Sequence, residues 1–188
     1  MTAQQRKQDV LIVGAGIAGL AQACALADAL GPDAAISIVE RGDIAAAAKP
    51  ADPRAYAISA GSKHLLDRLG AWGEIAPYAH PVTGIDITDS SLHDAFRPRL
   101  LGYDNRLETG EPGTYVVREA HVRAALLATA TRRPGVTLRG SAHITDVETN
   151  GSAARLELQD GTHLSAPLLI AADGRSTHVF GGLFAAYF

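Results

Sequence analysis

The sequence predicts an α/β fold built on a Rossmann-like dinucleotide-binding domain, and three features near its start carry that prediction. An apolar run at residues 10–13 leads into glycines at the G-x-G-x-x-G spacing, namely Gly14, Gly16 and Gly19. A helix-patterned segment follows, and a second apolar run then ends in Glu40. Glycines alone are a weak signal, but this order of strand, turn, helix and strand is the context in which the fingerprint binds a dinucleotide.

Each fingerprint residue has an expected physical role. Gly14 allows the tight turn, Gly16 leaves room for a pyrophosphate beside the backbone, and Gly19 lets the helix lie close to the strand. The start of the helix points its unpaired N–H groups and its positive dipole end at the phosphates. Glu40 is expected to accept hydrogen bonds from a ribose diol. The alternative is a flavodoxin-like loop without nucleotide.

The remaining elements follow from hydrophobic periodicity and from breaker residues. The first half has a first helix at 17–30 stopped by Gly31-Pro32, a second strand at 36–39, a loop at 42–53 and an amphipathic helix around 65–75 broken by two glycines. A half-buried strand at 82–88 and a candidate strand at 99–103 follow. An extended piece at 115–117 then leads into a helix at 118–133 that is ended by Pro134-Gly135. The basic pairs Arg97/Arg99 and Arg132/Arg133 are interpreted as solvated surface.

The last part of the sequence predicts a β-meander followed by one more strand. Asn-Gly at 150–151 and Asp-Gly at 160–161 separate short strands at 144–148, 153–159 and 163–165, and both dipeptides are strong hairpin signals. The apolar run at 168–171 reads as a fully buried strand that runs into Asp173-Gly174.

Composition limits the function classes. The 188 residues are 47% hydrophobic, enough for one domain or for one domain and part of another. A net charge of −3 gives no general attraction to nucleic acid. The single cysteine, Cys24, excludes an internal disulfide and is expected in the core, and the histidines lack metal-ligand spacing. Without a secretory signal or a long apolar span, we expect a cytoplasmic protein, or one peripheral to the inner membrane.

Four stretches together resemble a known family. They are the fingerprint with Glu40-Arg41, DPRAYAIS at 52–59, VVREAHVRAAL at 116–126 and LLIAADG at 168–174. In this order they are similar to the N-terminal half of the FAD-dependent aromatic monooxygenases of the para-hydroxybenzoate hydroxylase type, and most similar to the ubiquinone-biosynthesis hydroxylases. The resemblance covers about residues 9–173. The fingerprint is shared by many nucleotide-binding proteins, whereas the second and fourth stretches are more specific.

The resemblance implies FAD as cofactor, NAD(P)H as electron donor and an aromatic substrate, a polyprenylphenol of ubiquinone biosynthesis. It implies a discontinuous glutathione-reductase-type FAD-binding domain at 1–80 and 108–177, the first strands of an incomplete substrate sheet at 81–107 and an atypical tail at 178–188. Association with the enzymes of ubiquinone synthesis is a further implication. The implied cofactor-binding residues are Gly14, Gly16, Gly19, Glu40, Arg41, Arg54, Arg118, Asp173 and Gly174. No side chain is assigned as a catalytic acid or base.

Three of these residues also have a plain structural interpretation. Arg54 suits a phosphate or an electron-rich flavin edge, but it is equally an ordinary loop arginine. Arg118 stands at a helix start, where the dipole disfavours a cation, so it indicates either an anionic partner such as the FAD pyrophosphate or simple exposure. Asp173-Gly174 lies either at the cofactor crevice or in a plain turn.

The match breaks after Gly174. Thr177 and Phe180 stand near the places where the family has Ser and Arg, and the aromatic-rich ending suggests that the reading frame departs from the family near residue 178. We therefore expect a truncated chain with impaired hydroxylase activity. The alternatives are a non-catalytic flavin-binding remnant and a fragment of an NAD-dependent Rossmann dehydrogenase.

Overall fold

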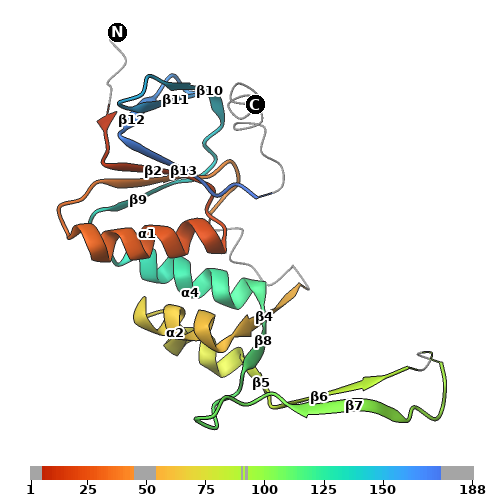
Figure 1. Cartoon of the computed structure of the whole chain (residues 1–188). Coiled ribbons are helices and arrows are strands. Elements are labelled where there is room, and N and C mark those ends of the chain that lie inside the picture. The colour runs from red at the N-terminus through yellow and green to blue at the C-terminus, as the bar shows by residue number, and fades with distance from the viewer. Residues whose placement is uncertain (1–5, 45–53, 90, 92, 175–188) are drawn as a thin grey trace.

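A four-stranded parallel sheet forms the centre of the protein. The computed structural model describes residues 6–44, 54–89, 91 and 93–174 (Figure 1). The strand order is β13-β2-β3-β9, where β2 is Val10–Val13, β3 is Ile36–Val39, β9 is Val136–Arg139 and β13 is Leu168–Ala171. All residues of β2 and β3 are buried, because these two strands are central and covered on both faces.

Two helices cover one face of this sheet. They are α1 (Ile17–Leu30) and α4 (Glu119–Thr131), which lie side by side below the sheet in Figure 1. Their small side chains allow close packing, and Cys24 is fully buried there, with its Sγ 4.0 Å from the Leu126 carbonyl oxygen. Burial raises the pKa of the Cys24 thiol. The predicted core position of this cysteine is confirmed.

An antiparallel meander covers the other face. It consists of β10 (Ile144–Thr149), β11 (Ala154–Leu158) and β12 (His163–Ala166), with the short β1 (Arg6–Lys7) beside β12. Leu156, Leu158 and Leu164 pack against Leu11 and Val13 of the central sheet. The two predicted hairpin turns are present, and Gly151 and Gly161 adopt φ values of 79° and 80°. The predicted meander is confirmed.

A smaller antiparallel sheet and a projecting ribbon complete the described chain. The sheet has the order β4-β8-β5, with β4 at Ala55–Ser59, β8 at Thr114–Arg118 and β5 at His80–Val82. The ribbon pairs β6 (Gly84–Thr88) with β7 (Arg99–Asp104) and extends away from the body in Figure 1. Between β4 and β5 lie α2 (Ala60–Arg68), α3 (Trp72–Ile75) and the 3₁₀ helix η2 (Ala76–Tyr78).

Three local predictions are corrected. The helix expected at 65–75 is two helices, separated near Gly70, whose φ of 77° ends the first. The strand expected at 82–88 is divided between two sheets. Val82 ends β5, which pairs with β8, and residues 84–88 form β6, which pairs with β7. The Thr83 carbonyl oxygen between them accepts a hydrogen bond from the Asn105 N–H. The strand at 168–171 is not fully buried. It lies at the edge of the described central sheet, and Leu168 is 44% exposed.

The strands β4 and β9 were absent from the prediction, as was the two-residue β1. β4 has only Tyr56 and Ile58 as strand-favouring residues, between two Ala and a Ser, and β9 follows Pro134-Gly135 with only four residues. Both are defined by long-range pairing, β4 with β8 and β9 with β3.

Arg133 is not the solvated surface residue that its sequence context suggested. Its guanidinium contacts both carboxylate oxygens of Asp28, at 2.9 and 2.7 Å, and donates to the Thr129 and Leu69 carbonyl oxygens. The Arg133 side chain is only 17% exposed. It therefore joins the C-terminal end of α4 to α1 and to the end of α2.

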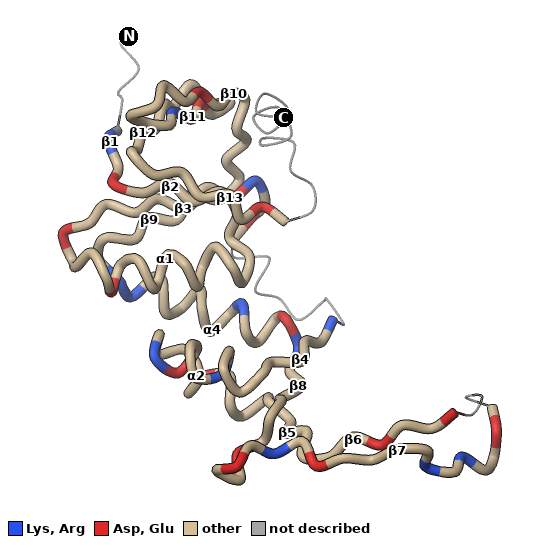
Figure 2. The backbone as a smooth tube through the Cα atoms, in the orientation of Figure 1, with Lys and Arg blue, Asp and Glu red and all other residues tan. Residues whose placement is uncertain are grey.

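Charges of both signs are interspersed along the described chain, as Figure 2 shows. Within the same residues, no helix combines the length and apolarity needed to cross a membrane.

Candidate cofactor site

The fingerprint turn lies at the C-terminal edge of the parallel sheet, where β2 ends. The Gly14 N–H bonds the Val39 carbonyl oxygen at 2.8 Å, and Gly14 has a φ of 104°. A Cβ atom at Gly14 would meet the Ala172 carbonyl oxygen and lie 2.8 Å from the Asp173 Cα. The turn therefore needs glycine for both its conformation and its packing. The ADG stretch lies directly against the fingerprint.

Gly19 has a similar packing role one helical turn later. A Cβ at Gly19 would meet the Gly14 carbonyl oxygen and lie 3.3 Å from the Ala172 Cβ. The close approach expected for Gly19 is thus made to the turn and to the chain after β13. It fixes the start of α1 against the end of the sheet.

Gly16 borders open space in front of α1. No atom lies within 4 Å of the position that a Gly16 Cβ would occupy. Gly16 is the N-cap of α1, which has no side-chain cap and no acidic residue in its first turn. Among the described residues, no side chain therefore caps the first N–H groups of the helix, and this arrangement fits a phosphate group.

Glu40 links the fingerprint turn to the end of β3. Its Oε2 accepts a hydrogen bond from the Ala15 N–H at 2.8 Å, and its Oε1 accepts one from the Gly42 N–H at 2.8 Å. Each carboxylate oxygen keeps acceptor capacity, so these bonds hold Glu40 in place without excluding a ribose hydroxyl. Its neighbour Arg41 is exposed at the same edge of the sheet.

Arg123 belongs to this region, although sequence reasoning did not single it out. Its Nε donates to the Ala15 carbonyl oxygen at 2.9 Å from the second turn of α4. The available signal in the sequence was an arginine on a helix that is otherwise mostly apolar. No local pattern indicates that α4 crosses beside the fingerprint.

The two other predicted arginines point to opposite faces of the β4–β8 pair. Arg54 forms an ion pair with Glu119, with Nη2 and Oε2 2.8 Å apart. Arg118 pairs in register with Ala55, and both line a cavity on the other face. The structure thus brings Gly14, Gly16, Gly19, Glu40 and Asp173 to one edge and separates Arg54 from Arg118. Gly174 lies in an exposed turn with a φ of 78°.

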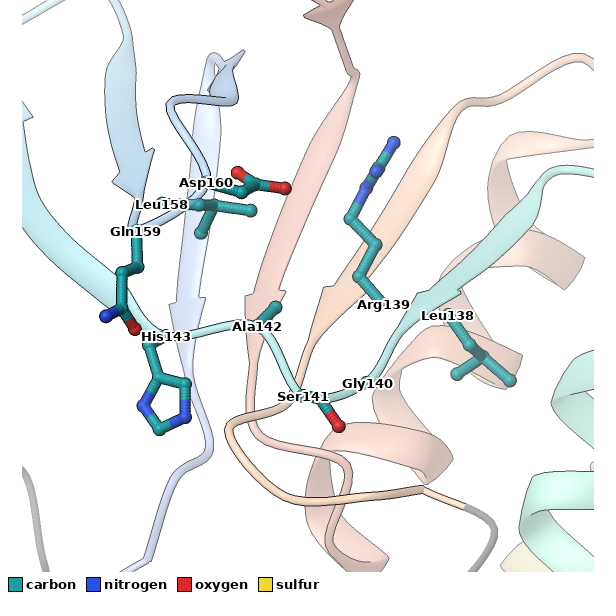
Figure 3. A pocket seen from close by; sticks show the side chains of 9 residues that line it. All are labelled: Leu138, Arg139, Gly140, Ser141, Ala142, His143, Leu158, Gln159 and Asp160. Atoms are coloured by element: carbon teal, nitrogen blue, oxygen red, sulfur yellow. The ribbon is translucent and has the colours of Figure 1, made fainter.

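A cavity of about 520 Å³ lies where residues 140–143 connect the central sheet to the meander (Figure 3). The buried Nε of Arg139 in its wall has no hydrogen-bond partner among the residues that the structure describes. In Figure 3 the Asp160 carboxylate extends toward Arg139, whereas the side chains of His143 and Gln159 extend away from it, so only part of the polar lining converges. None of the fingerprint glycines lines this cavity.

The parallel sheet, the glycine turn and the open, uncapped helix start define a dinucleotide-binding domain of the Rossmann-like class. A comparison of the sequence with known families identifies the family of dinucleotide-binding domain to which the chain belongs. The chain belongs to the family described as "FAD binding domain", which matches residues 7–181. FAD is the cofactor of this family, and the residues around Gly16 fit its pyrophosphate.

Two of the proteins with similar sequences are named as hydroxylases. The chain is 31% identical over 172 residues to "Ubiquinone hydroxylase UbiL" of Rhodospirillum rubrum, covering 91% of the chain and 38% of that protein. It is 29% identical to "3-demethoxyubiquinol 3-hydroxylase" of Escherichia coli, covering 91% of the chain and 42% of that protein. The chain therefore spans about two fifths of the length of these relatives.

Solved structures with the same fold are also longer than this chain. The p-nitrophenol 4-monooxygenase PnpA from Pseudomonas putida has a TM-score of 0.78 and 20% identity, covering 96% of this chain and 44% of that one. The flavin-dependent monooxygenase PieE, solved with FAD and substrate, has a TM-score of 0.75 and 18% identity, covering 95% of this chain and 32% of that one. The predicted FAD-binding fold is confirmed.

Proposed function

We propose that this chain is the FAD-binding portion of an FAD-dependent hydroxylase that acts on an aromatic ring. The observation that carries the proposal is the uncapped start of α1, which faces open space at Gly16 beside Glu40 and Asp173. Similarity to ubiquinone hydroxylases supports a polyprenylphenol as substrate and NAD(P)H as electron donor.

The chain's own residues have defined tasks in this proposal. The N–H groups at the start of α1 bind the pyrophosphate, and Gly16 leaves the space that it needs. Glu40 binds the ribose, with Arg41 at the same rim. Arg123 and Asp173 keep the turn in shape from either side. Arg54, which forms an ion pair with Glu119, contacts phosphate or flavin from the face that it shares with Glu119.

Bound flavin supplies the redox chemistry, by which one atom of O₂ enters the ring and the other leaves as water at the expense of two electrons from NAD(P)H. The protein must orient the ring and exclude water. We propose the division into an FAD-binding domain at 1–80 and 108–177 and the start of a substrate sheet at 81–107. The atypical tail at 178–188 lies outside the described residues.

A flavin-binding remnant without turnover is the second candidate function. The β6–β7 ribbon pairs with no other strand in the described parts of the chain, and several of its apolar side chains are exposed. A substrate held against this ribbon alone would be open to water. NAD(P)H oxidation that yields only peroxide supports the remnant, whereas hydroxylated product supports the enzyme. An NAD-dependent dehydrogenase is disfavoured, because the family match is to an FAD binding domain.

Flavin content tests the proposal. The purified chain, reconstituted with FAD, should show visible flavin absorbance after removal of free cofactor. In Gly16→Val the new side chain occupies the pyrophosphate space, so FAD should be lost while far-UV circular dichroism is unchanged. Gly73→Val is the matched control, since Gly73 also borders open space but lies away from the fingerprint. Unchanged flavin content in Gly16→Val would exclude this site.

Peripheral contact with a membrane or with other enzymes of quinone synthesis is a further part of the proposal. The ribbon supports it, because Phe96 and Leu100 are 81% and 70% exposed, and such apolar groups mark interaction surfaces. Co-flotation with phospholipid vesicles, lost in Leu100→Ser, checks the membrane contact. Equal flotation of the wild type and Leu100→Ser would show that the ribbon does not contact the membrane.

A further inference from the structure

The loop at residues 105–113 leads from the β6–β7 ribbon to strand β8 and forms a compact base for the ribbon. At its start, the Asn105 Nδ2 donates to the Val82 carbonyl oxygen at 2.8 Å, and the Asn105 N–H bonds the Thr83 carbonyl oxygen at 2.9 Å. The Gly113 N–H closes the other end onto the Asn105 carbonyl oxygen at 2.6 Å. A movement of this loop therefore moves the base of the ribbon with it.

Glu111 attaches this loop to helix α2. Its Oε1 lies 3.2 Å from the Lys63 Nζ, and its Oε2 lies 2.9 Å from the His64 Nε2. The backbone carbonyl oxygen of Glu111 accepts a hydrogen bond from the Leu107 N–H at 2.8 Å, so the loop is closed on itself at this residue. Two consecutive residues of α2 thus contact one oxygen each of the same carboxylate.

Aromatic side chains hold Lys63 in place. Its Nζ lies 6.0 Å from the centre of the Trp72 ring, which is within the range of a cation–π contact. The Trp72 ring packs edge-to-face on Tyr115 of β8, with the centroids 5.2 Å apart. Glu74, the one acid of α3, forms its ion pair with Arg132. Because Lys63 is already placed by this packing, less side-chain entropy is lost when the loop carboxylate binds it.

The Glu111 carboxyl group responds to both cations of α2. Hydrogen bonds from His64 and from Lys63 lower the pKa of Glu111 below its usual range, so the carboxylate is ionised at neutral pH. In the same loop, Arg106 forms an ion pair with Asp104. Histidine is the side chain whose charge ordinarily changes between about pH 5 and pH 8, so in that range the contact varies through His64.

We propose that Glu111 is a positioning residue, which sets the direction in which the β6–β7 ribbon leaves the body of the protein through its contacts with Lys63 and His64. The ribbon projects far from the body in Figure 1, so a small change at its base is magnified at its end. The consequence for catalysis rests on the proposed function, in which the ribbon begins the substrate sheet. A charged imidazole strengthens the contact, so the ribbon is held most firmly at mildly acidic pH.

Spin labels on the two parts of the complete chain measure this direction. Gln22→Cys on α1 and Leu100→Cys on the ribbon provide exposed sites, whereas the native Cys24 is fully buried. The distribution of distances between the two labels should be narrow at about pH 5.5 and broader at about pH 8, because the imidazole loses its charge in this range. Glu111→Gln should broaden or shift the distribution at both pH values. His64→Gln should remove the pH dependence.

Glu108→Gln is the matched control, because Glu108 is an exposed glutamate of the same loop. It should leave the distance distribution unchanged, and circular dichroism checks that every variant is folded. A wild-type distribution in Glu111→Gln, an equal broadening in Glu108→Gln, or a pH dependence that survives His64→Gln would overturn the proposal. The distances are measured without flavin or turnover, so failure here leaves the cofactor assignment unaffected, and loss of the flavin site leaves this contact intact.

Discussion

The Nε atom of Arg123 donates a 2.9 Å hydrogen bond to the carbonyl oxygen of Ala15, which lies 108 positions earlier in the chain. The N–H group of the same Ala15 bonds the Glu40 carboxylate at 2.8 Å. One peptide segment of the fingerprint is therefore held from both sides, by a cation on α4 and by an anion at the end of β3. This arrangement fixes the turn before any cofactor binds.

We predict that loss of the Arg123 side chain loosens the turn. Arg123→Met should lower the free energy of unfolding by about 1–3 kcal/mol, the usual cost of losing a hydrogen bond to a charged group. It should also weaken FAD binding, because the turn would no longer be preorganised. Chemical denaturation and flavin titration measure the two effects. Arg155→Met should change stability by no more than about 0.5 kcal/mol. An Arg123→Met protein that matches the wild type in both assays would contradict this role.

Gly14 and Gly16 should respond differently to the same substitution. Gly14→Ala places a methyl group against the Ala172 carbonyl at a φ of 104°, so we expect a loss of about 2–4 kcal/mol from backbone strain and overpacking. Gly16→Ala adds a methyl group in open space and should leave stability within about 0.5 kcal/mol. Thermal and urea unfolding of both variants provide the measurement. Similar stability losses in the two proteins would argue against the described turn geometry.

The Asp28–Arg133 ion pair should make stability depend on acid pH. Hydrogen bonding from Arg133 lowers the pKa of Asp28 below its usual range. The unfolded chain then takes up the proton first as pH falls. The stabilisation is complete above about pH 4 and is lost as pH drops through the lowered pKa.

Because the Asp28 side chain is 51% exposed, the pair should contribute less than about 1 kcal/mol. Asp28→Asn should remove that part of the pH dependence below about pH 4, as measured by urea unfolding. Asp33→Asn, at an exposed loop position, serves as control. The same acid dependence in Asp28→Asn and the wild type would show that the pair does not contribute.

Local sequence patterns were sufficient where the structure depends on neighbouring residues. The glycine spacing predicted the turn after β2, and the apolar runs predicted β2 and β3. The Asn-Gly and Asp-Gly pairs predicted the meander. These elements follow from backbone conformation and from the alternation of Leu156 and Leu158, which short stretches of sequence record.

Family resemblance added the cofactor, since FAD and NAD fingerprints share the same glycines. It could not place the side chains that depend on several elements at once. Arg54 and Arg118 resembled two groups of one site, yet the pairing of Ala55 with Arg118 sends them to opposite faces. Arg133 resembled surface and is a half-buried link to Asp28.

The sequence by itself determined the dinucleotide-binding class, because a strand, a glycine turn and a helix start are local and encode a phosphate site in consecutive residues. Only the tertiary structure decided which distant residues complete that site. Arg123 reaches Ala15, and Ala172 and Asp173 close against Gly14, because α4 packs against α1 and β13 pairs with β2 after long excursions of the chain. Contacts of that kind depend on strand order and helix packing, which no spacing within the sequence specifies.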